Sequence, residues 1–406
     1  MPETFPPKEV GRRGGTKGAA FGFALLLVGP SLGQVQKYTG TEGLLLYLLV
    51  AFGFWLLVPH FLRAPKALAS EHQVYGLALV TGVVLILLFL ALYPVADSGI
   101  VGGGSDRDDA LNLGARELLR GRCPYHVTTY LGNPIAPLPG GVVLALPFVL
   151  LFGNSAYQNF FWLAIFFLLA QQVLREARHA LLLLWSLLVF SPVLLQQIIT
   201  GGDLPANSIA VLVLSWLMMR VPRPWKPAAA LLLGVSLAWR LNFLLLLPLL
   251  LGLLWREVGG KAALGLLGLI LGAFGSLVLP FALHAPHGVS PFLEQNKFAR
   301  FEGIFPHASL LLPLAAGGYA LVRSRASADA IGFFRESAHV LAFPIACGLI
   351  LTTLQTGRLD LRLADYGVSF LFFGALAYWP SLAWGQGGAA WCTAPSVRES
   401  AWDQEA

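Results

Sequence analysis

The chain has 406 residues, of which 56% are hydrophobic and only 12% are charged, and its mean hydropathy is +0.70. This composition excludes an ordinary soluble enzyme. It predicts an all-α polytopic membrane protein, because backbone amides within the hydrocarbon must be bonded inside their own segment. The net charge of +6 does not indicate a nucleic-acid partner, since the Lys and Arg residues stand in small groups beside apolar segments, where they fix membrane topology.

Apolar segments recur along the chain without a polar block long enough to fold alone, so we expect one membrane domain over residues 1–384 and a disordered cytoplasmic tail over 385–406. Residues 228–254 are too long for one span and are interrupted at Arg240, which predicts a short helical hairpin with Arg240 at its apex. With this hairpin we expect about twelve membrane-traversing helices. The other spans are expected near residues 18–34, 43–62, 75–95, 156–174, 180–200, 207–221, 262–284, 305–322, 337–354 and 366–384.

The short apolar run 140–152 decides the topology of everything after it. If this run crossed the membrane, the later basic clusters, such as Arg175 with Arg178 and Arg220 with Arg223, would all lie outside, against the positive-inside rule. We therefore predict a re-entrant or juxtamembrane helix here and both termini in the cytoplasm. The outer face then collects residues 105–139, 201–206, 284–307 and 355–365 together with Arg240.

The outer loop 105–139 holds three closely spaced carboxylates, Asp106, Asp108 and Asp109. Ser105 and Asp108 have the spacing of a capping box, and apolar residues follow at helical spacing, which predicts a short amphipathic helix along the membrane surface. On these residues alone, Asp108 is either a catalytic group or a group that stabilises the first helical turn. Asp106 precedes the helix and follows a Gly-rich run, so it is placed to accept a proton from a hydroxyl nucleophile.

A family resemblance extends this interpretation. Asp106 is followed by the pattern Ala115-Arg116-Glu117-Leu118-Leu119-x-Gly121, then by Pro124-Tyr125, Tyr130 and Pro134/Pro137 before an apolar run. This order resembles the first outer loop of GT-C type glycosyltransferases, most of all the polyprenyl-phosphate-mannose-dependent branch. The resemblance implies a GT-C membrane fold and a carboxylate base in this loop, Asp106 first and Asp108 second, with Asp109 as a further candidate. Three apolar segments precede the loop in this chain, where the family often has one.

Two later stretches also resemble this branch. Gly201-Gly202-Asp203 followed by Asn207 is similar to its Gly-polar-x-Asn helix start. Leu233-Gly234 through Arg240 to Leu247-Pro248 is similar to its Leu-Gly…Lys-Pro…Leu-Pro hairpin, with Arg240 in the Lys position. These matches imply that Asp203, Asn207 and Arg240 contribute to substrate binding.

Arg240 has a case of its own, because a cation inside an apolar hairpin is costly unless it is paired or functional. A lipid phosphate is a suitable partner, since a guanidinium binds it through two parallel hydrogen bonds, and pairing with Asp203 or another acid is the alternative. Arg358 and Lys297 are further candidates for phosphate binding from the outer loops, as are Arg300 and Arg362, although for each of the four a solvated charge is the simpler interpretation. Aromatic residues, Tyr125, Tyr130, Trp239 and Tyr366, either stack on a sugar or belong to an interfacial belt.

The cysteines and histidines do not predict a metal centre. Cys123, Cys347 and Cys392 form no CxxC pair, and His284-x-x-His287 stands beside Pro286 without a tight ligand group. A phosphate is already a good leaving group, so the expected chemistry requires neither a metal nor a cofactor.

We therefore expect a glycosyltransferase of the plasma membrane, with bacterial origin favoured and the active site outside. Its expected partners are a polyprenyl-phosphate sugar donor, a lipid or glycan acceptor and membrane lipid. Asp106 would deprotonate the acceptor, which predicts inversion at the anomeric carbon. The alternatives are a transporter or flippase of a lipid-linked or small anionic substrate, whose path Arg240 would line, and a non-catalytic assembly partner in which the carboxylates only cap a helix.

Overall fold

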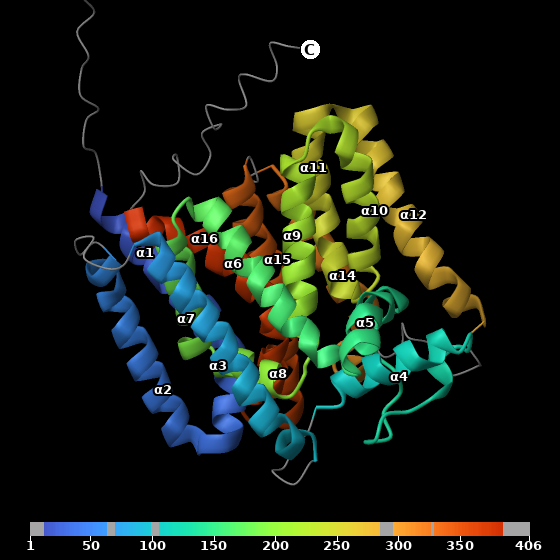
Figure 1. Ribbon diagram of the computed structural model, residues 1–406, viewed down its shortest axis with the longest axis horizontal. Coiled ribbons are helices and arrows are strands. Elements are labelled where there is room, and N and C mark those ends of the chain that lie inside the picture. Colours follow the sequence, from blue (N-terminus) through green and yellow to red (C-terminus); the bar gives the residue numbers. More distant parts are fainter. Residues whose placement is uncertain (1–11, 63–69, 99–104, 285–294, 326–328, 385–406) are drawn as a thin grey trace, which may run out of the picture.

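The computed structural model describes residues 12–62, 70–98, 105–284, 295–325 and 329–384 (Figure 1). These ranges are helical and contain no β-strand beyond a single bridge between Thr128 and Pro134, so the all-α prediction is confirmed. The helices of the first half are α1 (Arg12–Val28), α2 (Leu32–Leu62), α3 (Glu71–Asp97), α4 (Arg107–Leu119), α5 (Pro139–Phe152), α6 (Gln158–Leu174), α7 (Ala177–Phe190) and α8 (Pro192–Ile199). Those of the second half are α9 (Leu204–Arg220), α10 (Lys226–Leu237), α11 (Leu247–Val258), α12 (Gly260–His284), α14 (Ala308–Arg323), α15 (Ala330–Thr356) and α16 (Val368–Trp384).

Helix α16 lies at the centre of the bundle and packs against α15, α1 and α9 (Figure 1). Its sequence is apolar all round, and 83% of an 18-residue window within Arg362–Trp384 is buried, against 17% for a window of the same length within Glu71–Ala96 of α3. A helix that is apolar on every face belongs inside a protein or in lipid. The contrast therefore identifies α16 as the core and α3 as a helix whose apolar surface faces outward.

Within the described ranges, seven helices are long and apolar enough to cross a membrane, or eight if α7 and α8 together form one span. Apolar helices of this length indicate a membrane protein. The expected count of about twelve is not confirmed. α9 and α14 are apolar but shorter than a full span, and Ala20–Leu56 counts as one stretch across the expected boundary between the first two spans.

Two breaks in the bundle involve proline or polar residues. The expected span 180–200 is divided into α7 and α8, which bend by 86° where Pro192 begins α8, as proline cannot continue the preceding helix. The predicted hairpin 228–254 is confirmed as α10 and α11, joined by the 3-10 helix η5 (Leu241–Leu246). Arg240 lies at the break with extended backbone.

Helices α4 and α5 pack on each other at one end of the bundle (Figure 1). α4 confirms the predicted helix after Asp106, but the predicted capping box is wrong: the N-cap is Asp106, and its side chain makes no capping hydrogen bond. α5 begins at Pro139 and ends at Gly153, which is left-handed with φ 75°. Its 14 residues are too few for a full crossing, in line with the predicted short helix.

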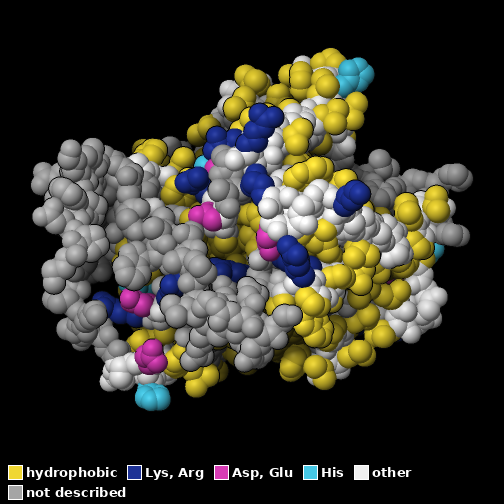
Figure 2. All heavy atoms as spheres, turned by 90° about the horizontal axis from the view of Figure 1, so that it is seen from above, with side chains coloured by type: hydrophobic (Ala, Val, Ile, Leu, Met, Phe, Trp, Pro, Cys, Tyr) yellow, Lys and Arg dark blue, Asp and Glu magenta, His cyan; other side chains and the backbone are white. Residues whose placement is uncertain are grey.

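The basic clusters lie at the opposite end of the bundle. α6 ends beside Arg175, α9 at Arg220 and α14 at Arg323, and Figure 2 shows Lys and Arg side chains gathered on this face. A short helix at residues 140–152 predicts that these later basic clusters share one face, and they do. The tail 385–406 and the Gly102–Gly104 run lie outside the described residues.

Candidate functional site

A cavity of about 400 Å³ lies between α4, the loop after it, η5, α15 and the 3-10 helices η6 (Ala299–Phe301) and η7 (Arg362–Gly367). One part of its wall is polar and another is apolar. The polar lining consists of Asp106, Arg107, Asn133, Arg240, Asn242, Gln295, Lys297, Tyr366 and Ser369. The apolar lining includes Phe298, Phe301, Leu341, Pro344, Ile345 and Leu363.

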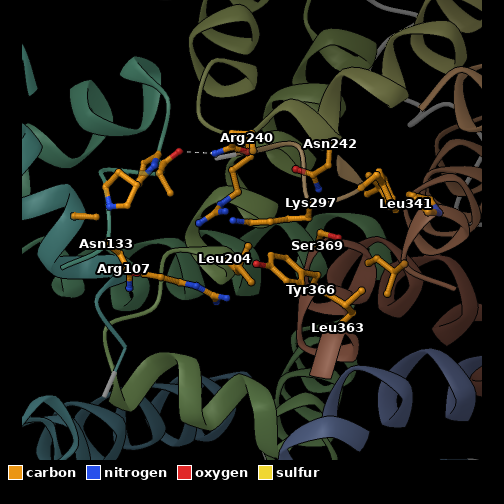
Figure 3. Close-up of a pocket in the computed structure, with 18 of the residues that line it drawn as sticks. Arg107, Asn133, Leu204, Arg240, Asn242, Lys297, Leu341, Leu363, Tyr366 and Ser369 are labelled. Atoms are coloured by element: carbon orange, nitrogen blue, oxygen red, sulfur yellow. Dashed lines mark hydrogen bonds between the residues drawn. The ribbon is translucent and has the colours of Figure 1, made fainter. Parts of the chain in front are cut away.

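Three cations reach this cavity from separate parts of the chain. Figure 3 shows Arg107, Arg240 and Lys297 pointing toward the same space, with the Tyr366 hydroxyl facing them. Arg107 donates from Nη1 to Gln197 Oε1 at 3.0 Å, and its guanidinium carbon lies 5.5 Å from the Tyr366 ring centroid. Like charges around one half-open cavity raise the potential there, so the cavity favours an anionic ligand.

Arg240 is aimed into the cavity by a buried carboxylate. Its Nη2 donates to Asp203 Oδ1 at 2.6 Å and to Oδ2 at 2.8 Å, and its Nε donates to Oδ2 at 3.2 Å. Trp239 Nε1 donates to the same Oδ2 at 2.9 Å. Asp203 is fully buried and Arg240 is 8% exposed. The alternative of an Arg240–Asp203 pair is thus confirmed, and the paired Arg240 still lines the cavity.

The start of α5 fixes the backbone around Arg240. The Leu138 amide donates to the Trp239 carbonyl at 3.1 Å, and the Gly140 amide donates to the Ala238 carbonyl at 2.7 Å. A Cβ added at Gly141 would lie 2.3 Å from Trp239 Cδ1, so only glycine permits this approach. The short apolar helix thereby stabilises the break in the α10–α11 hairpin.

Asp106 is the carboxylate that lines the cavity. It is half-buried at the N-cap of α4, and Thr129 Oγ1 and Asn133 Nδ2 each donate to its Oδ2 at 2.7 Å. Both donors come from the loop between α4 and α5, which closes on itself through the Thr129–Asn133 backbone bond of 2.9 Å. One carboxylate oxygen is therefore held by the loop, and the group is fixed at the cavity wall.

The other two acids of this turn are placed elsewhere. Asp108 is fully buried and accepts a hydrogen bond from the Tyr93 hydroxyl, which in turn accepts one from Asn154 Nδ2 at 2.8 Å. Asp109 accepts from the Tyr130 amide at 3.0 Å. Neither Asp108 nor Asp109 lines the cavity. The structure does not bring these two expected site residues to the cavity, because a helical turn points successive side chains in different directions.

Four further expected substrate-binding residues also fall outside the cavity lining. Tyr125 is buried and donates to the Pro137 carbonyl at 3.0 Å, and burial raises the pKa of Tyr125. Asp203 does not line the cavity but forms an ion pair with Arg240, which does. Asn207 is buried and donates to the Ser236 carbonyl at 3.4 Å, and Arg358 is exposed.

Arg107, Asn133, Asn242 and Gln295 are lining residues that the sequence reasoning missed. For Arg107 a signal existed, because a cation in the first turn of a helix opposes the helix dipole and so requires another reason to be there. The amides gave no comparable signal. Gln295 donates from Nε2 to the Ala136 carbonyl at 2.6 Å, a contact across 159 residues of sequence.

Among the residues that the structure describes, no three His, Cys, Asp or Glu side chains come together as a metal site. Comparisons of the chain with protein-family models, with curated proteins and with solved structures gave no match.

Proposed function

We propose that the protein is a membrane glycosyltransferase that transfers a sugar, with mannose as the first candidate, from a polyprenyl-phosphate donor to a hydroxyl of a lipid or glycan acceptor. The observation that carries the proposal is the shared cavity: Asp106 lines it together with the three cations Arg107, Arg240 and Lys297. A base and a phosphate-binding set in one enclosed space are what such a transfer requires. The resemblance of residues 106–137 to GT-C type loops points to the same chemistry.

The residues have separate roles in this proposal. Asp106 accepts the proton of the acceptor hydroxyl while the acceptor oxygen attacks the anomeric carbon from the side opposite the phosphate. Arg240, Arg107 and Lys297 stabilise the negative charge that develops on the departing lipid phosphate. A single displacement inverts the anomeric carbon.

The apolar part of the wall suits the lipid portion of the donor. Phe298, Ile345 and Leu363 are partly exposed residues of this apolar wall, so an isoprenoid chain can lie against them while its phosphate meets Arg240. We place the reaction at the outer face of the plasma membrane, since the basic helix ends gather on the opposite face.

The test compares two single-charge variants of the same helical turn. Asp106→Asn should lower transfer from a polyprenyl-phosphate hexose by about 10²- to 10⁴-fold, the range for loss of a general base. Asp109→Asn removes the same charge from a residue that does not line the cavity and should keep most of the activity. Transfer is measured by mass spectrometry of the glycosylated acceptor in reconstituted membranes. Equal rates for the two variants would contradict the proposal, and transmembrane movement of the lipid without glycosylation would favour the transporter.

A further inference from the structure

We propose that the charge of Asp106 also selects which lipid phosphate the cavity holds. Ionised Asp106 favours the donor, a phosphodiester with one negative charge, and neutral Asp106 favours the product, a phosphate monoester with two. This inference rests on the proposed function and adds to it a rule for the release of the product.

The first support is the distribution of charge around the cavity. Asp106 is the one carboxylate among the described lining residues, whereas three lining residues are cations. The acid behind Arg240, Asp203, is fully buried and is held by both Arg240 and Trp239, so it does not face the ligand space. Asp365, which precedes the lining residue Tyr366, accepts a hydrogen bond from Gln34 Nε2 at 2.5 Å and is not itself a lining residue. A ligand phosphate therefore meets the repulsion of Asp106 and the attraction of the three cations.

The second support is the balance of the reaction. A bond forms between the acceptor oxygen and the anomeric carbon, and the bond from that carbon to the phosphate oxygen breaks. The phosphate oxygen keeps the electron pair, so the lipid phosphate changes from a monoanionic diester to a dianionic monoester. The acceptor proton moves to Asp106, which becomes neutral. The ligand gains one negative charge at the moment when the wall loses one.

The product consequently stays bound as long as Asp106 holds the proton. When the proton leaves, the carboxylate again repels the lipid phosphate, and the repulsion is greater for the dianion than for the monoanion. The proton lost by Asp106 thus releases the product and restores the form that accepts the next donor.

The experiment measures binding rather than turnover. The purified full-length chain in detergent is titrated with farnesyl phosphate and with its methyl phosphodiester at pH about 8, where a phosphate monoester is mainly dianionic because its second pKa is about 6. Asp106→Asn, which keeps an amide oxygen for Thr129 and Asn133, imitates the neutral side chain. We expect it to tighten the monoester on the order of tenfold more than the diester, which corresponds to about 1.4 kcal/mol. Asp109→Asn is the matched control and should change neither affinity.

The outcomes separate this inference from the proposed function. If Asp106→Asn shifts both ligands equally or neither, the charge rule is wrong, while binding that is lost in the double variant Asp203→Asn with Arg240→Gln, which leaves no unpaired buried charge, still supports the donor site. If the wild-type chain binds neither ligand, the proposed function is contradicted as well. If Asp109→Asn tightens the monoester as much as Asp106→Asn does, the effect belongs to the net charge of the helix turn, and the specific role of Asp106 is refuted.

Discussion

Two parts of the bundle bury a carboxylate completely and pair it with arginine. At the cavity, Asp203 holds Arg240, whose side chain is 10% exposed. Near the opposite face, Glu336 in α15 accepts from Arg323 Nε at 2.6 Å and from Arg335 Nε at 3.2 Å, and those side chains are 38% and 46% exposed.

The difference lies in what the cations reach. The two arginines on Glu336 are each more than one-third exposed, so solvent reaches their guanidinium groups, and this cluster is explained by its position near the end of α14. Arg240 instead projects into the cavity, whose lining it shares with Arg107 and Lys297. Convergence within a cavity, rather than the number of charges, therefore makes the region around Arg240 the candidate ligand site.

The largest effect should come from removing Arg240. Arg240→Gln leaves Asp203 buried without its cation, and breaking a buried pair in this way costs about 3–5 kcal/mol of stability. The double variant Asp203→Asn with Arg240→Gln removes both charges and keeps the comparison interpretable. We expect it to lose affinity for a short-chain isoprenyl phosphodiester by on the order of 100-fold, as for a buried charged contact worth about 3 kcal/mol.

The matched control is Arg323→Gln at the other arginine pair. Because Arg323 is more than one-third exposed, we expect a small loss of thermal stability and an unchanged ligand affinity. If Arg323→Gln lost as much ligand affinity as the double variant, the two arginine pairs would not differ in their contribution to ligand binding.

A second prediction concerns Gly141 in α5, which packs closely on Trp239 next to the Arg240–Asp203 pair. In Gly141→Ala the new methyl group would meet Trp239, and overpacking of this kind costs about 1–3 kcal/mol. Gly265→Ala in α12 has nothing within 4 Å of the added atom and should be neutral or stabilising. Thermal unfolding in detergent measures both variants. Equal unfolding midpoints for the two variants would mean that the packing of α5 on Trp239 does not stabilise the helix break at Arg240.

Much of the fold followed from the sequence because lipid imposes simple rules. Segment length and the positive-inside rule predicted the short helix at 140–152 and the hairpin around Arg240, and both are confirmed. Helix count was harder, because α9, α10 and α14 depend on packing against their neighbours rather than on spanning length. The 86° bend before α8 was missed because Pro192 lies inside an otherwise apolar run.

The site was predictable only in part. The sequence favoured Asp106 and Arg240, and the structure brings these two to one cavity. The sequence ranked Asp106 before Asp108 but could not predict their different surroundings, which come from contacts between separate elements, with Thr129 for Asp106 and with Tyr93 for Asp108. Asn133, Asn242 and Gln295 have no periodicity or motif, and only the fold brings these residues from three separate parts of the chain to the cavity wall.

A third, smaller effect concerns Tyr125, which stabilises the cavity wall through one hydrogen bond. Its hydroxyl donates to the carbonyl of Pro137, a lining residue, and burial raises the pKa of Tyr125, so the hydroxyl stays a donor in alkaline solution. Tyr125→Phe should cost about 0.5–1.5 kcal/mol, the usual worth of one such bond. Tyr38→Phe, at a side chain 56% exposed, is the control for thermal unfolding. Indistinguishable midpoints for the two variants would remove this role.

The smallest expected effect is a change with pH in the loop beside the cavity that Glu302 holds together. Glu302 follows the lining residue Phe301 and accepts hydrogen bonds from the His307 amide at 2.6 Å and from the Ser309 amide at 2.9 Å. The Ser309 hydroxyl also donates to it, and these bonds hold the pKa of Glu302 below its ordinary 4.5.

A lowered pKa in the folded state means that ionised Glu302 stabilises the loop fully above pH 4.5 and that this contribution disappears as the pH falls through the lower folded value. Hydrogen exchange at the His307 and Ser309 amides should therefore become less protected in acid. In Glu302→Gln the protection should be weaker at neutral pH and lose its acid dependence, since an amide keeps one acceptor oxygen but no titrating charge. Unchanged acid dependence in that variant would assign the pH effect to another group. Because Glu336 lies near the opposite face, Glu336→Gln should leave the exchange of these two amides as it is in the wild type.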